Sequence, residues 1–80
     1  MKKIVSISQI IEINNHLKEN SLPYSIHLKD ACGGQSFSIE VINNETEEDK
    51  KKLVEFLDVY FTSYRMKVVY GIDQYHFTIQ

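Results

Sequence analysis

The residues best suited to chemistry lie in one short stretch around Cys32, the only cysteine in the chain. Gly33 and Gly34, two of the three glycines, follow it directly. A glycine pair allows a tight turn, in which backbone N–H groups can line a binding concavity. A thiol acts as a nucleophile when a histidine, a cation or a helix N-terminus lowers its pKa. Cys32 therefore has two interpretations: a reactive thiol, or a small apolar side chain at a hairpin end, which the alternation of the preceding residues favours.

Polar groups surround this turn. The alternation places Asp30 on the apolar side, opposite Phe37, where a carboxylate either accepts N–H groups of the turn or lies at an open end of the core. Gln35 adds an amide on the other side of the glycines. If the chain has a binding site, we expect it at this end of the sheet. The candidate binding residues are Asp30, Cys32, Gly33, Gly34, Gln35 and Ser36.

Histidines offer a second set of chemical groups. His27 is predicted to pair with Glu40 on the polar face of the sheet, and His76 is predicted on the same face, opposite Val69. Together with Cys32 these side chains are zinc-type ligands, but the chain has no C-x-x-C or H-x-x-x-H spacing. Neither of the glycine-rich nucleotide motifs occurs. The sequence therefore predicts no metal site and no cofactor.

The elements that position these groups follow from periodicity. A first helix is predicted from about Ser6 to Asn20, because Ser6 and Gln9 fit a capping box and Pro23 prevents continuation. Its apolar face holds Ile7, Ile10, Ile13 and Leu17, with Ile11 near the edge of that face.

Two segments of alternating apolar and polar residues flank the glycines and predict a hairpin. A turn at Gly33-Gly34, or a loop of residues 32–35, pairs Leu28 with Ile39. A second hairpin joins residues 66–70 to residues 75–79, with Tyr70 opposite Tyr75. In both hairpins one face is apolar.

A second helix is predicted to start near Thr46, a suitable N-cap, with acidic residues in its first turn. Its apolar stripe is the clearest in the chain, and we expect it to supply the main anchor of the core through Phe56. The stripe contains Leu53, Phe56, Leu57, Tyr60, Phe61 and Tyr64.

The predicted fold class is α+β, as one domain over residues 1–80. The order is α-β-β-α-β-β, with two helices packed on one face of a four-stranded, mainly antiparallel sheet. An isolated hairpin is marginally stable, so the two hairpins are expected to share this sheet. Its other face is then open.

The glycine turn also carries a family resemblance. It is similar to that of a group of small bacterial proteins of unknown function named for an Arg-Asp-Ala-Cys signature. Here Lys29 stands where the signature has arginine, and the similarity covers fewer than ten residues, from Lys29 to Phe37. The resemblance implies a bacterial source and implies no particular activity, cofactor or fold.

Composition narrows the function classes. A net charge of −2 and a single basic run argue against a nucleic-acid-binding protein. One cysteine excludes an internal disulfide framework, and no apolar run approaches the length of a membrane span. We expect a cytoplasmic protein that contacts neither nucleic acid nor membrane.

Two functions remain from the sequence. The first is a small binding or regulatory module that acts through protein association, including a homodimer through the open sheet face or an edge strand. The second is a thiol-dependent catalyst or redox protein that uses Cys32. The first is favoured over an enzyme, because no complete catalytic set can be assembled from the sequence.

Overall fold

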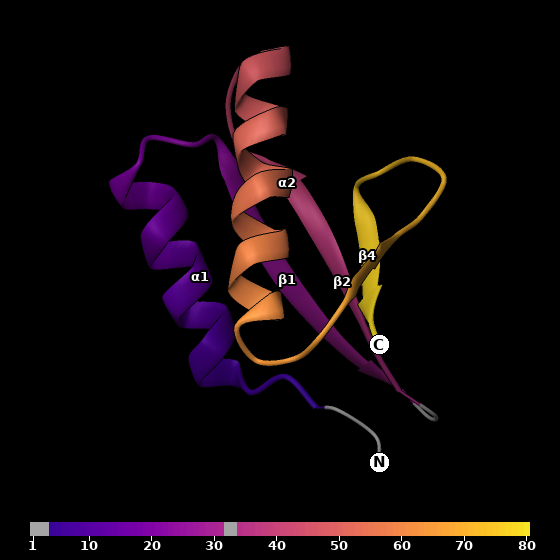
Figure 1. Cartoon of the computed structure of the whole chain (residues 1–80). Coiled ribbons are helices and arrows are strands. Elements are labelled where there is room, and N and C mark those ends of the chain that lie inside the picture. Colours follow the sequence, from indigo (N-terminus) through magenta and orange to yellow (C-terminus); the bar gives the residue numbers. More distant parts are fainter. Residues whose placement is uncertain (1–3, 32–33) are drawn as a thin grey trace.

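The computed structural model describes residues 4–31 and 34–80 and confirms the predicted α+β fold (Figure 1). The strands form one sheet in the order β1-β2-β4-β3, with every neighbouring pair antiparallel. The elements are α1 (Ile7–Glu19), β1 (Tyr24–Ala31), β2 (Gly34–Val41), α2 (Glu47–Thr62), β3 (Val68–Tyr70) and β4 (His76–Ile79).

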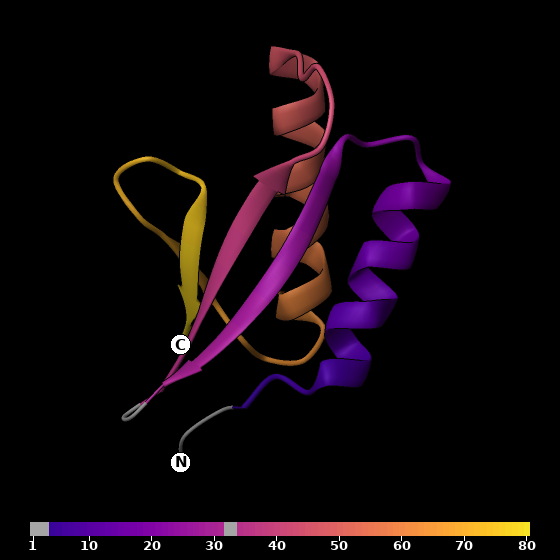
Figure 2. The same cartoon turned by 180° about the vertical axis from the view of Figure 1, so that it is seen from behind.

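The helices leave one face of the sheet uncovered. Figure 1 shows α2 in front of the sheet and α1 next to β1, and Figure 2 shows the sheet from the side that neither helix covers. We call this uncovered side the open face. Within the described residues, no helix combines the length and apolar character needed to cross a bilayer.

Local sequence signals determine where both helices begin. The Ser6 hydroxyl accepts the N–H of Gln9, and the Gln9 side chain accepts the N–H of Ser6, so the predicted capping box is confirmed. Thr46 and Asp49 form the same reciprocal pair at the start of α2. Each box satisfies two backbone groups that a helix terminus otherwise leaves without partners.

The core lies between the helices and the covered face of the sheet. Its buried side chains come from every element except β3, and the segment before α1 adds Val5. The members are Val5, Ile10, Ile13, Leu17, Tyr24, Ile26, Phe37, Ile39, Leu53, Leu57, Phe61 and Phe77.

Two predictions about the apolar faces are wrong. Phe56 is half-buried and stacks on the His16 ring with centroids 3.9 Å apart, so it fills the seam between α1 and α2 instead of anchoring the core. Ile7, which is predicted on the apolar face of α1, is 69% exposed, whereas Ile11, predicted near the edge of that face, is 56% exposed. Both errors arise because an apolar stripe is wider than the part of a helix that its neighbours cover.

The predicted registers of both hairpins are wrong by two residues. Leu28 lies opposite Phe37, so Asp30 faces Gln35. In the second hairpin Tyr70 lies opposite Phe77, so Val69 faces Thr78 and not His76. A shift of two residues keeps every side chain on its predicted face, and alternation alone therefore cannot detect it.

The second loop shows what selects its register. Asp73 Oδ1 accepts the N–H of Tyr75 at 2.9 Å, and Gln74 adopts a left-handed φ of 61°. Gly71 N–H then donates to His76 O at 2.7 Å and closes the loop. Tyr75 is consequently part of the connection and not the partner of Tyr70. The first connection, at residues 32–33, lies outside the described residues.

Candidate functional site

The structure places the predicted glycine-turn residues in different roles. Gln35 is engaged by the chain itself, because its side-chain oxygen accepts Val5 N–H at 2.8 Å and its nitrogen donates to Val5 O at 2.9 Å. Asp30 is exposed at the end of β1, and Ser36 is exposed on the open face. Gly34, the first residue of β2, pairs with Ala31.

Cys32 and Gly33 lie outside the described residues, so a thiol site at this turn stays a prediction. The amide of Gln35, however, anchors the segment before α1. It adds the hydrogen bonds that another strand would add, because its two atoms match the N–H and C=O of one residue.

The histidines form two separate pairs on the open face. His27 Nε2 lies 2.7 Å from Glu40 Oε1, which confirms the predicted contact, although the two residues are diagonal neighbours. His76 Nδ1 lies 2.8 Å from Asp73 Oδ2. Ser38 is opposite both histidines, between them. Within residues 4–31 and 34–80, no three ligating side chains gather into a metal site.

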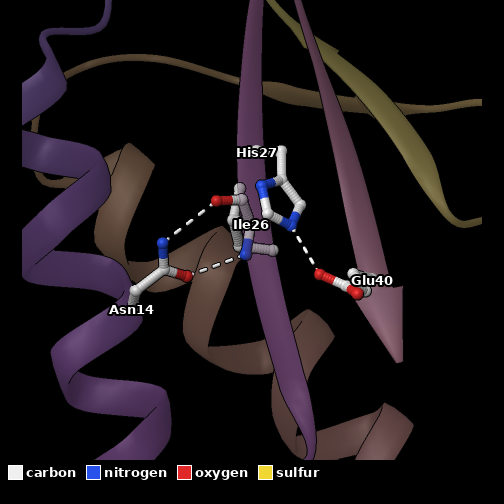
Figure 3. Close-up of polar contacts among 4 residues, drawn as sticks. All are labelled: Asn14, Ile26, His27 and Glu40. Carbon is white, nitrogen blue, oxygen red and sulfur yellow. Dashed lines mark hydrogen bonds and ion pairs between the residues drawn. The ribbon is translucent and has the colours of Figure 1, made fainter. Parts of the chain in front are cut away.

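The outer edge of β1 carries the feature that sequence reasoning missed. Asn14 of α1 reaches across to this edge strand, as Figure 3 shows. Its Oδ1 accepts the N–H of Ile26 at 2.7 Å, and its Nδ2 donates to Ile26 O at 3.0 Å. The side-chain amide therefore occupies both outward backbone groups of Ile26, as a neighbouring strand would. The only signal in the sequence is a carboxamide at the border of the apolar face of α1.

The same alternation identifies which other backbone groups point outward. In an antiparallel pair, successive residues direct their N–H and C=O groups to opposite sides. Leu28 and Asp30 share the parity of Ile26, so their groups point away from β2. No hydrogen bond from a described residue reaches these four groups. We call residues 28–30 the open stretch of β1.

Residues 24–27, in contrast, form the covered stretch. Tyr24 N–H donates to Leu22 O at 2.9 Å, and the Tyr24 hydroxyl donates to Glu45 Oε2 at 2.5 Å. Glu45 also accepts the hydroxyl of Tyr75, whose ring lies 3.8 Å below the Lys50 ammonium. The hydrogen bonds from Tyr24 and Tyr75 lower the pKa of the Glu45 carboxyl. This end of the sheet is therefore held by a network of side chains.

Exposed apolar side chains lie on the flank of α1 to which Asn14 belongs. By helical geometry, Ile7 and Ile11 lie within about 60° of Asn14 around the axis of α1, on the flank that faces the β1 edge. They are 69% and 56% exposed. The ribbons of α1 and β1 separate towards the C-terminal end of β1 (Figure 1). Within the described residues, this edge thus has backbone groups without a hydrogen-bond partner, and the neighbouring helix has an exposed apolar flank.

The opposite edge of the sheet differs. β3 spans only Val68–Tyr70, and very short edge strands are a common way to prevent pairing with another chain. The open stretch of β1 is therefore the candidate functional site.

Comparisons with protein-family models, with curated proteins and with solved structures gave no match. The resemblance of residues 29–37 to the Arg-Asp-Ala-Cys group accordingly stays a prediction. The functional conclusion rests on the geometry of the chain itself.

Proposed function

We propose that the protein is a small binding module that associates with another protein by accepting one of its extended strands along the open stretch of β1. The supporting observation is that the N–H and C=O groups of Leu28 and Asp30 point away from β2 and receive no hydrogen bond from a described residue. Strand addition uses such groups for affinity and the neighbouring side chains for specificity.

An uncovered edge strand is normally a liability, because it pairs with any exposed strand. In this chain the protection is selective. Asn14 binds the outward N–H and C=O groups of Ile26. The described residues form no hydrogen bonds to the outward groups of Leu28 and Asp30, two and four positions further along the strand. An edge that is protected over one part and available over another is suited to a strand of limited length.

The apolar flank supports the same proposal. Ile7 and Ile11 are exposed and share the flank of α1 from which Asn14 reaches the outer edge of β1. Burying an aliphatic side chain contributes about 1.5–3 kcal/mol, so two partly exposed isoleucines can supply a substantial part of a modest affinity.

The test compares two variants at one position. Asp30→Pro removes the outward N–H, and its ring obstructs the edge without breaking a bond to β2, because proline is tolerated where the N–H faces solvent. Asp30→Ala removes only the exposed carboxylate and is the matched control. Both variants should fold, with the stability of Asp30→Ala within about 0.5 kcal/mol of the wild type.

Eight-residue peptides selected from a random display library on the wild-type chain are then measured against both variants. We expect Asp30→Pro to weaken them roughly tenfold or more, since it removes a main-chain hydrogen bond and blocks the approach. Asp30→Ala should weaken them by much less, because it removes only an exposed charge and leaves the outward N–H of residue 30 in place. Amide exchange should slow at Leu28 and Asp30 on binding. Peptides that bind Asp30→Pro as well as the wild type, or a library that yields no binder, would contradict the proposal.

A further inference from the structure

We infer that the partner is a different chain, whose strand runs antiparallel to β1 and carries a basic, an acidic and an apolar residue in that order. This inference rests on the proposed function and specifies the chemistry of the partner. It follows from the side chains that an added strand would meet along the open stretch.

The alternation of β1 divides those side chains between two faces. Lys29 is on the open face with His27, and Leu28 and Asp30 are on the side of the helices. Residues directly opposite one another in a sheet project to the same face, with Cβ atoms about 5 Å apart. The partner therefore meets one cation on the open face, and one carboxylate and one aliphatic side chain on the other.

Lys29 calls for an acidic residue opposite it. Its neighbour on β2 is the uncharged Ser36, and no carboxylate of a described residue lies within ion-pair distance. Glu40, the acidic side chain of the open face on β2, is engaged by His27. The backbone groups of Lys29 bond to β2, so its pairing with an added strand is of the non-hydrogen-bonded type, in which side chains come closest.

The positions on either side of Lys29 call for different residues. Opposite Asp30, a basic residue gains a favourable charge pair, since the described neighbour of Asp30 on β2 is the neutral Gln35. Opposite Leu28, which is half-buried, an apolar residue packs against the leucine side chain. In an antiparallel strand these positions read, from the N-terminus, basic, acidic, apolar. Asn14 binds the outward backbone groups of Ile26, so pairing with the added strand ends after these three residues.

A second copy of this chain fits the edge poorly. A two-fold dimer through β1 pairs the edge antiparallel with itself. If Lys29 pairs with Lys29 of the second copy, two ammonium groups lie opposite one another. If Asp30 pairs with Asp30 of the second copy, two carboxylates lie opposite one another. A register centred on Leu28 sets Asp30 opposite Ile26, whose backbone groups Asn14 already binds. Each symmetric pairing therefore meets like charges or lacks hydrogen bonds, and a heterologous strand is favoured.

The test uses two synthetic peptides of eight residues with the same composition. One contains the core Lys-Glu-Val and the other contains Glu-Lys-Val, both between uncharged flanks. We expect wild type to bind the first roughly five- to tenfold more tightly at low salt, because both charge pairs reverse in the second. The double variant Lys29→Glu/Asp30→Lys should show the opposite preference. Raising the salt concentration to about 1 M should diminish the preference in both cases.

N-methylation separates this inference from the proposed function. Methylating the valine amide of the Lys-Glu-Val peptide blocks a bond to Leu28, whereas methylating the glutamate amide, which faces away from β1, does not. If methylation of the valine amide abolishes binding and methylation of the glutamate amide does not, strand addition is supported. If the Lys-Glu-Val and Glu-Lys-Val peptides bind with equal affinity, and methylation of the valine amide alone still abolishes binding, only the inferred partner chemistry is overturned. Absence of the N-methyl pattern, or of any binding, would overturn strand addition as well.

Discussion

The covered and open stretches of β1 belong to one strand but are used differently. In the covered stretch, Tyr24 and Ile26 are 3% and 1% exposed, and side chains from other elements bind the edge. In the open stretch, Leu28 is half-buried and Asp30 is exposed. Side chains alternate between the two faces in both stretches, although Asp30 puts a carboxylate at an apolar position of the pattern. The difference shows that alternation assigns faces, whereas the neighbouring elements decide which part of an edge is available.

The cause of the difference is the path of the chain. α1 leads through a short connection into the start of β1, which keeps the C-terminal half of the helix beside the covered stretch. The hairpin of β1 and β2 then extends past the start of α1 (Figure 2). Val5, which precedes α1, hydrogen-bonds to the Gln35 side chain of β2 at this end of the hairpin.

The largest expected effect comes from removing the side chain that separates the two stretches. Asn14→Ala leaves the N–H and C=O of Ile26 without their partners and should destabilise the protein by about 1–3 kcal/mol. It also leaves the backbone groups of Ile26 available to the two-fold dimer in which Leu28 pairs with Leu28 of the second copy. The variant should therefore self-associate more strongly. Chemical denaturation and sedimentation would measure the two effects. Asn15→Ala, at an exposed neighbour on the same helix, is the control. Equal behaviour of the two variants would contradict the assigned role.

Gln35→Ala tests the other carboxamide, at the hairpin end. It removes two hydrogen bonds to Val5, a residue that is 1% exposed, so we expect a loss of about 1–2 kcal/mol in unfolding free energy. Ser36→Ala, next to it but exposed on the open face, should change stability by less than about 0.5 kcal/mol. A Gln35 variant as stable as the Ser36 variant would show that the anchoring of Val5 contributes nothing.

Glu45→Gln tests the network that holds the covered stretch. The carboxyl has a lowered pKa in the folded protein, so its contribution is present above its ordinary value of 4.5 and is lost as pH falls through the folded pKa. We expect a destabilisation of about 1 kcal/mol at pH 7. The difference from wild type should narrow below pH 4.5. Glu55→Gln, at an exposed position of α2, is the control, and a difference that does not depend on pH would argue against the carboxylate bonds.

The smallest effect requires no substitution. Native-state hydrogen exchange should be slow at the Ile26 amide, which Asn14 binds, and roughly tenfold or more faster at the Leu28 and Asp30 amides, for which no described residue provides an acceptor. Equal protection along β1 would mean that the open stretch is covered, and would remove the basis of the proposed function.

The sequence by itself determined the local structure. Capping boxes begin both helices at the predicted residues, because the partners lie three positions apart in the chain. Alternation assigned Ile26 to the buried face and His27 to the open face, since a strand directs successive side chains to opposite sides. It also included Asp30 among the candidate binding residues. These results depend only on near neighbours along the chain.

Only the tertiary structure decided which edge is open. The strand order places β1 at an edge, and it depends on pairing between segments that are far apart in sequence. Registers shifted by two residues preserve every face, so the pattern did not distinguish them. The bonds from Asn14 to Ile26 and from Glu45 to Tyr24 and Tyr75 join residues 12, 21 and 30 positions apart. Such contacts form only where folding brings the elements together, so no local pattern of residue types predicts them.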